Sequence, residues 1–213
     1  MKENKVKIAI FLMFFLNIIG SFGLFFDEIE SVILLLTPIN LLILLVLFYW
    51  ANGYRKISFI FTITVIFLFG FLVELIGVHY KFIFGDYSYG NALGLKIFQT
   101  PLIIGVNWIN LSLACFGISS FFVSHNFLVA LIASTLMVLT DFIIEPLSGL
   151  LDFWYWSGNQ IPLQNYIGWF LVSLLIQLFL VRSKVELKIQ LCFALLISQI
   201  IFFLIQYINH GLF

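Results

Sequence analysis

The sequence predicts an all-α polytopic membrane bundle with about seven transmembrane helices. Hydrophobic residues make up 63% of the 213 residues and charged residues only 9%, which is far outside the composition of soluble globular domains. Apolar runs of about 20 residues, the length that crosses a bilayer, recur along the whole chain. We expect helices at residues 6–26, 31–50, 57–80, 99–123, 126–150, 164–181 and 188–208, all within one transmembrane domain over residues 1–213.

The first two predicted helices carry no candidate site residue. A basic start followed by Ser21 and Gly23 also fits a signal peptide, but the apolar run is longer than the usual core of such a peptide. Pro38 and Asn40 interrupt the second helix. We expect both helices to pack against the bundle or to face lipid.

The third helix carries Glu74 inside an apolar run, about 9 Å before its end at Tyr80. Gly70 and Gly77 permit the close approach of a neighbouring helix. His79 lies near the membrane surface. Glu74 is therefore the first acid that the sequence places within the membrane.

The fourth and sixth helices carry polar side chains that need partners within the membrane. Asn107 and Asn110 lie three residues apart on one face of the fourth helix, beside Trp108. The sixth helix begins near Asn165, with Trp169 one turn further along.

The fifth helix carries two more acids. Asp141 and Glu145 are four residues apart, so both side chains lie on one face, about 6 Å apart along the axis. Pro146 follows and leaves the carbonyl of Phe142 without its helical partner. We expect the helix to kink or stop here.

Two connections rich in aromatic residues follow the acids. Residues 84–91 read FGDYSYGN and include Tyr87 and Tyr89, and a second connection carries Trp154 and Trp156. These rings suit a membrane interface.

The distribution of basic residues predicts a cytoplasmic N terminus. In that orientation both aromatic connections face outward. Only Lys81 and Lys96 then lie outside, and eight basic residues lie inside, as the positive-inside rule requires: Lys2, Lys5, Lys7, Arg55, Lys56, Arg182, Lys184 and Lys188.

The chain also contains a loose internal repeat. Glu74 leads through an aromatic connection to Trp108 in 34 residues, and Asp141 leads through a similar connection to Trp169 in 28. Both helix pairs cross the membrane in the same sense, which predicts parallel repeats of the third and fourth helices and of the fifth and sixth.

The three acids are the strongest indication of function. A charged acid at the centre of a membrane costs about 2.5–3.5 kcal/mol, so intramembrane acids are usually functional, although some are structural. The predicted spans hold no Lys or Arg near Glu74, Asp141 and Glu145. Desolvation and mutual repulsion therefore favour a neutral carboxylic acid, which can donate a proton.

Other classes of site are not indicated. His79, His125 and His210 are scattered, so no metal site is expected. Cys115 and Cys192 lack a pairing or metal-binding spacing, and no nucleotide fingerprint or basic run marks a cofactor or nucleic acid. We expect the partner to be membrane lipid or a molecule dissolved in it.

Several motifs together resemble the membrane-integral carotenoid biosynthesis proteins, which include the carotenoid 1',2'-hydratases and bisanhydrobacterioruberin hydratase. The resemblance covers roughly residues 60–175. It rests on Glu74-x-x-Gly77-Val-His79, Gly85-Asp-Tyr-Ser-Tyr89, Pro101 with Asn107-Trp108, Asp141-x-x-x-Glu145-Pro146, Trp154-x-Trp156 and Ile161-Pro162-x-x-Asn165-Tyr-x-x-Trp169.

The resemblance implies a carbon–oxygen lyase that needs no cofactor and adds water to the terminal 1,2 double bond of an acyclic (psi) carotenoid, giving a tertiary alcohol. It also implies a lipid-soluble carotenoid substrate, a bacterial or archaeal cell membrane and other enzymes of the same pathway as partners.

The acids suit that chemistry, because hydration requires one protonated acid and one ionised base. Within a catalytic core at about residues 57–181, Glu74, Asp141 and Glu145 are the candidate catalytic residues, with Asp141 the expected donor because it lies deepest. Aromatic faces stabilise a nearby cation by about 0.5–2 kcal/mol each. The expected lining of the substrate cation is His79, Tyr87, Tyr89, Asn107, Trp108, Trp154, Trp156, Asn165 and Trp169.

Three alternatives remain open at this stage. A cyclase would use the same protonation but close a ring, and a small proton-coupled carrier would use the acids as a relay. A purely structural role would leave carotenoid products unchanged in Asp141→Asn and Glu74→Gln variants.

Overall fold

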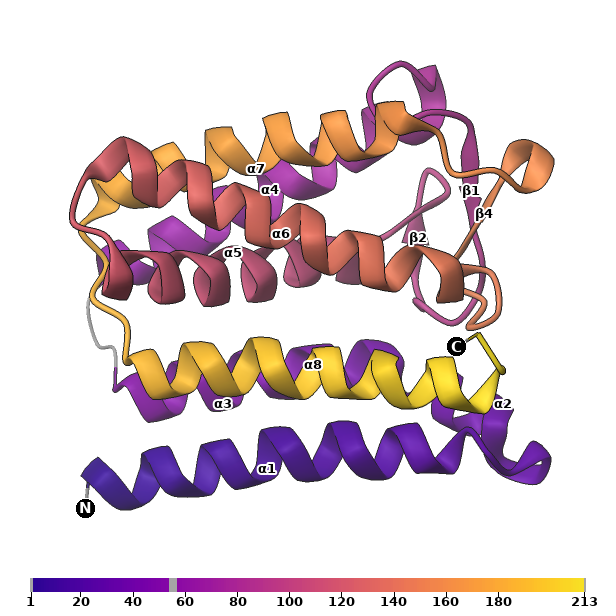
Figure 1. Ribbon diagram of the computed structural model, residues 1–213, viewed down its shortest axis with the longest axis horizontal. Helices are drawn as coiled ribbons and strands as arrows, with labels where there is room; N and C mark the ends of the chain where they lie inside the picture. The colour runs from indigo at the N-terminus through magenta and orange to yellow at the C-terminus, as the bar shows by residue number, and fades with distance from the viewer. Residues whose placement is uncertain (1, 54–56, 213) are drawn as a thin grey trace.

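The computed structural model describes residues 2–53 and 57–212 as helices that run side by side, with short strands at one end (Figure 1). Helices α4 to α7 form one group, and α1, α3 and α8 form a second group beside it (Figure 1). In chain order the elements are α1 (Lys2–Gly23), α2 (Asp27–Leu35), α3 (Thr37–Asn52), α4 (Ile57–Tyr80), β1 (Tyr87–Tyr89), β2 (Lys96–Ile97), β3 (Thr100–Pro101), α5 (Ile103–Phe122), α6 (Asn126–Ser148), β4 (Trp154–Trp156), the 3₁₀ turn η1 (Ser157–Asn159), α7 (Leu163–Ser183) and α8 (Ile189–Asn209).

Within the described residues, six helices are long and apolar enough to cross a membrane: α1, α4, α5, α6, α7 and α8. Helices α2 and α3 meet the same criterion together, although they are bent by 53° at their junction, and they make a seventh span if they cross as one. The chain is therefore an integral membrane protein. The prediction of an all-α bundle with about seven membrane helices is confirmed, with the strands confined to connections.

The bend between α2 and α3 corrects the continuous helix that we expected at residues 31–50. Pro38 stands in the first turn of α3. It has no N–H to donate to the carbonyl of Leu34, and its ring would collide with that carbonyl in an unbroken helix. The new helix begins where Asn40 donates its backbone N–H to the carbonyl of Leu36 at 2.9 Å.

The hairpin of β2 and β3 occupies the residues where we expected the fourth helix to begin, so α5 starts only at Ile103. Ile97 pairs with Thr100 across a two-residue turn. Both turn residues, Phe98 and Gln99, have positive φ angles of 47° and 65°, as a tight hairpin of this kind requires.

Helix α6 runs to Ser148, two residues past Pro146, so the proline lies in its last turn. The predicted interruption is therefore the helix end itself. The Ser148 hydroxyl donates to the carbonyl of Glu145 at 2.9 Å and satisfies one of the final carbonyls.

Glycines bring α4 and α5 into close contact. A Cβ added at Gly70 would lie 2.6 Å from the ring of Trp108, and one added at Gly105 would lie 2.7 Å from the ring of Phe67. Trp108 is fully buried as a result. Gly77, which we also expected to admit a helix, instead makes room for Phe84 of the connection that follows α4.

The end opposite the β1–β4 sheet gathers several basic residues. The Lys5 amine lies 5.2 Å from the centre of the Trp50 ring, and the Lys188 amine donates to the carbonyl of Ala51, so the ends of α1, α3 and α8 meet there. Arg55 and Lys56, which contribute to the predicted orientation, lie outside the described residues.

Candidate active site

Strands β1 and β4 form an antiparallel pair that covers one end of the bundle (Figure 1). Tyr87 lies opposite Trp156, and Tyr89 lies opposite Trp154. Because side chains alternate along a strand, these four rings share one face of the pair. The pairing joins the two aromatic connections, which are more than 60 residues apart in sequence.

Glu74 is buried beneath this sheet and accepts three hydrogen bonds. The hydroxyls of Tyr87 and Tyr89 donate to its Oε2 at 2.6 and 2.7 Å, and the indole Nε1 of Trp108 donates to its Oε1 at 3.1 Å. Glu74 is 3% exposed. Burial, followed by the Glu74 charge, raises the pKa of Tyr87 and of Tyr89 well above the ordinary tyrosine value, so both remain donors at neutral pH.

Glu145 is held by an equivalent set of donors from the other half of the chain. The indoles of Trp156 and Trp154 donate to its Oε2 at 2.6 and 3.2 Å, and the Asn165 amide donates to its Oε1 at 2.8 Å. Each carboxyl thus receives two aromatic donors from a strand and one donor from the following helix.

Asp141 lies one turn deeper on α6 and shares the donor of Glu145. The amide nitrogen of Asn165 donates to Oδ2 of Asp141 at 2.8 Å as well as to Glu145. The other oxygen of Asp141, Oδ1, is buried and has no hydrogen-bond partner within the described residues. One side chain therefore links the two acids of α6.

A small cavity lies between the two glutamates. Its volume is about 20 Å³. A cavity of about 10–15 Å³ holds one water molecule, so this one has room for about one. Its lining residues are Glu74, Phe84, Tyr87, Tyr89, Ile104, Glu145, Trp154, Trp156, Asn165 and Trp169.

Stacked indoles border the same region. The rings of Trp108 and Trp169 lie 4.3 Å apart and are inclined by 19°. They come from α5 and α7, the helices that follow β1 and β4. The two carboxyls therefore lie among aromatic faces.

The only described ion pair near the aromatic connections lies on their exposed side. The Lys81 amine contacts the Asp86 carboxylate at 2.8 Å, and it holds the pKa of Asp86 below its ordinary value. None of the lining residues is basic. No group of three His, Cys, Asp or Glu side chains suited to a metal occurs in residues 2–53 and 57–212.

Comparison with known proteins assigns the chain to a family. The model of the carotenoid biosynthesis protein family matches residues 31–212. The chain belongs to this family of carotenoid biosynthesis proteins. The match extends beyond the residues 60–175 that carry the resemblance in sequence, and it indicates an enzyme of carotenoid biosynthesis. No curated protein and no solved structure matches the chain.

In this carotenoid biosynthesis protein, most of the predicted site residues come together. Glu74 and Glu145 line the cavity with Tyr87, Tyr89, Trp154, Trp156, Asn165 and Trp169, while Trp108 binds Glu74. Asp141 does not line the cavity and reaches it only through Asn165.

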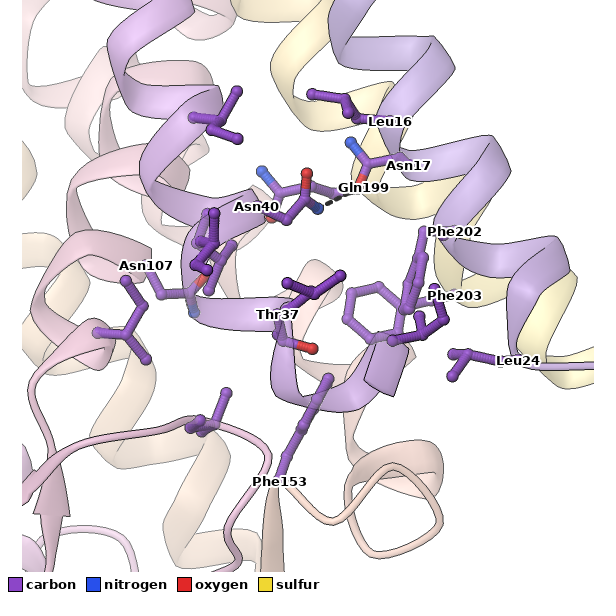
Figure 2. Close-up of a pocket in the computed structure, with 18 of the residues that line it drawn as sticks. Leu16, Asn17, Leu24, Thr37, Asn40, Asn107, Phe153, Gln199, Phe202 and Phe203 are labelled. Atoms are coloured by element: carbon purple, nitrogen blue, oxygen red, sulfur yellow. Dashed lines mark hydrogen bonds between the residues drawn. The ribbon is translucent and has the colours of Figure 1, made fainter. Parts of the chain in front are cut away.

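Two predicted lining residues lie elsewhere. The His79 ring is exposed, and its Nδ1 lies 2.9 Å from the carbonyl of Leu75 on the same helix. Asn107 lines a larger apolar groove (Figure 2). Conversely, Phe84 and Ile104 line the cavity although the sequence does not single them out, because apolar residues are not distinctive in so apolar a chain.

Proposed function

We propose that the protein hydrates the terminal 1,2 double bond of an acyclic psi-end carotenoid to a tertiary alcohol, which makes it a carbon–oxygen lyase. The observation that supports this most directly is a cavity for about one water molecule with a carboxyl group on two of its sides, those of Glu74 and Glu145. Besides the alkene, hydration needs one water molecule, one acid and one base, and it needs no redox partner.

The reaction balances with protons alone. A carboxylic acid protonates the less substituted alkene carbon, which breaks the π bond and leaves a tertiary cation on the neighbouring carbon. The water oxygen bonds to that carbon and gives a proton to a carboxylate. Transfer of this proton back to the first acid restores the site, so one water is added and nothing is oxidised or reduced.

Glu145 is the proton donor in this proposal. It lines the cavity, and it shares the Asn165 amide with Asp141. Two carboxyls that share one amide donor and have no basic neighbour repel each other when both are ionised, which favours a neutral acid at one of them. This assignment replaces Asp141 as the expected donor, because Asp141 does not reach the cavity, and it makes Asp141 a positioning residue.

Glu74 is the base in this proposal. It accepts three hydrogen bonds from neutral donors, which favour an ionised carboxylate and oppose the effect of burial, which favours the neutral acid. It lies on the helix opposite the acidic pair, so water between them can be oriented by Glu74 while Glu145 protonates the alkene.

The aromatic lining would stabilise the cation. Trp154, Trp156 and Trp169 face the cavity, and each aromatic face near a cation contributes about 0.5–2 kcal/mol. The same rings exclude bulk solvent, which prevents uncontrolled capture of the cation.

The water-sized cavity favours hydration over the cyclase alternative, since ring closure requires that water be kept from the cation. A proton-coupled carrier would need acids that form a relay across the membrane. Both glutamates instead lie at one end of the bundle, beside the β1–β4 sheet (Figure 1). With Lys5 and Lys188 at the opposite end, the positive-inside rule would place the acids toward the outer side of a bacterial or archaeal cell membrane.

Expression in a lycopene-producing bacterial host tests the proposal. We expect pigments that gain the mass of one water per hydrated end, and an unchanged mass with a ring would identify a cyclase instead. Because general acid–base catalysis contributes about 100- to 10 000-fold, Glu145→Gln and Glu74→Gln should each lower hydration by that order. Glu28→Gln, at an exposed acid at the start of α2, is the matched control and should hydrate normally. Full activity of both site variants would disprove the mechanism.

A further inference from the structure

A second and much larger cavity lies beside the acids, on the side of α1, α3 and α8. Its volume is about 470 Å³. Figure 2 shows its walls, with Phe153, Phe202 and Phe203 at one side and Asn17, Asn40 and Gln199 at the other. We call this space the apolar groove, because apolar side chains form most of its lining.

The groove opens toward the lipid-facing surface. Ile19 of α1 and Ile39 of α3 line it and remain 54% and 51% exposed, so its mouth lies between these two helices. Leu36 and Thr37 at the break between α2 and α3 also line it. The break between α2 and α3 therefore forms part of the wall of the groove.

The groove adjoins the small cavity beside the acids, because two residues line both. Ile104 and Trp154 line both the groove and the small cavity. Ile144, which lines the groove, directly precedes Glu145. The indole N–H of Trp154 donates to Glu145 at 3.2 Å, the longer of the two tryptophan bonds to that carboxyl.

We propose that the apolar groove binds the polyene chain of the carotenoid, with Trp154 and Ile104 between the groove and the acids. This inference rests on the proposed function. The acid cavity, at about 20 Å³, has no room for an isoprenoid end, so the substrate must enter it from an adjoining space. The groove adjoins it, opens to lipid and lies within the volume range of about 300–1,000 Å³ typical of ligand sites.

Several polar side chains of the groove have hydrogen-bond partners within the protein, whereas Oδ1 of Asn40 is buried and has none among the described residues. The Asn40 amide donates to the Asn17 oxygen at 3.3 Å, and the Gln199 amide donates to the carbonyl of Leu195 at 3.1 Å. Asn17 also donates to the Ser198 hydroxyl at 3.1 Å. An apolar chain can therefore lie in the groove without displacing water from most of these groups.

Filling the groove far from the acids tests the proposal. Gly20 of α1 lines the groove, and a Cβ built there meets no atom within 4 Å, so the ring of a Gly20→Phe variant extends into the space. Purified protein in detergent is titrated with lycopene, and binding is followed by quenching of tryptophan fluorescence. We expect Gly20→Phe to weaken binding at least tenfold.

Matched controls separate blocking from misfolding. Ile18→Phe adds a ring at an exposed position of the same helix that does not line the groove, and it should bind lycopene as the original chain does. Ile39→Trp enlarges a half-exposed side chain at the mouth of the groove and should also weaken binding. Unchanged binding in both Gly20→Phe and Ile39→Trp would overturn the proposal, as would a groove that retains phospholipid and never exchanges it for lycopene.

The test is independent of the reaction. Glu145→Gln is expected to bind lycopene but not to hydrate it. If the original chain binds lycopene, Gly20→Phe does not, and neither changes the mass of the pigment, the groove assignment stands and the proposed hydration is wrong. Hydration that persists undiminished in Gly20→Phe contradicts the groove alone.

Discussion

The contact between Gly70 and Trp108 offers a sharp test of how the bundle positions Glu74. In a Gly70→Ala variant the new methyl group would lie 2.6–2.7 Å from Cβ, Cγ and Cδ1 of Trp108. These atoms are at the base of the side chain, which is fully buried and stacked on Trp169. The clash can therefore be relieved only by separating α4 from α5.

The size of the effect follows from that geometry. Ordinary van der Waals contact begins near 3.4 Å, so the helices must separate by about 1 Å. Overpacking of this kind costs about 1–3 kcal/mol, and the better helix propensity of Ala returns about 0.5–1 kcal/mol. A net loss of up to about 2.5 kcal/mol lowers Tm by up to about 10 °C in a protein of this size.

Activity should fall further than stability suggests. The 3.1 Å bond from Trp108 to Glu74 is near the limit of a useful hydrogen bond, and moving the indole by about 1 Å breaks it. A displacement of that size at a catalytic group costs about 100-fold in rate. Trp108→Phe, which removes the N–H without adding a methyl group, should show a similar loss of hydration.

Both quantities can be measured on the purified protein. Cys115 and Cys192 are free and buried, so a thiol-reactive dye reports unfolding in detergent. Gly149→Ala is the matched control, because its methyl group would meet Tyr155 at an ordinary 3.5 Å. The reasoning is refuted if Gly70→Ala hydrates lycopene within twofold of the original chain and unfolds at the same temperature.

Two further predictions concern the aromatic donors. Trp156→Phe removes the 2.6 Å bond to Glu145, worth about 1.5–3 kcal/mol, and should lower hydration about 10- to 150-fold. Tyr155→Phe loses only a bond from an exposed ring to the half-buried Asp152 and should hydrate normally. Equal hydration rates in the two variants, measured by pigment analysis, would contradict the role assigned to Trp156. Burial and the Glu74 charge raise the pKa of Tyr87 and of Tyr89 well above the ordinary tyrosine value of about 10, so in absorbance titration their double Phe variant should show the same phenolate signal near pH 10 as the original chain. A smaller signal in the variant near that pH would show that these hydroxyls ionise normally.

The membrane helices could be predicted from sequence because each depends on local hydropathy. The expected span at 57–80 coincides with α4, and α7 and α8 begin within one residue of expectation. The break at Leu36 also has a local cause in Pro38, and the sequence marks that position. Glu74, Asp141 and Glu145 stand out because acids are costly in an apolar segment.

The arrangement around the acids could not be predicted in the same way. Strands β1 and β4 have three residues each, which is too short for an alternating pattern to be recognised. With 27 Phe, 8 Tyr and 5 Trp in the chain, the aromatic residues that bind Glu74 and Glu145 are not distinctive. His79 and Asn107 were expected at the site because they belong to the motifs that carry the family resemblance, but the direction of each side chain depends on packing that sequence does not reveal.

The predicted repeat acquires a more specific form from the hydrogen bonds. Tyr87 and Tyr89 follow Glu74 by 13 and 15 residues, and Trp154 and Trp156 follow Asp141 by the same intervals. By sequence spacing, Asp141 is therefore the counterpart of Glu74. The indoles of Trp154 and Trp156 nevertheless donate to Glu145, which lies one helical turn nearer the β1–β4 sheet. Superposition of α4–β1–α5 on α6–β4–α7 remains the test of the repeat itself.

This difference between the two halves gives the proposed reaction its direction. Two equivalent acids facing one water would compete for the same role, because each could equally well protonate the alkene or accept the proton of water. Glu145 has a second carboxyl beside it through Asn165, and Glu74 has only neutral donors. In the proposed mechanism the proton is therefore assigned to the side of α6 and the negative charge to the side of α4. Removing Asp141, for example as Asp141→Leu, should make the halves more alike and slow hydration even though Asp141 does not line the cavity, while lycopene binding in the groove stays unchanged.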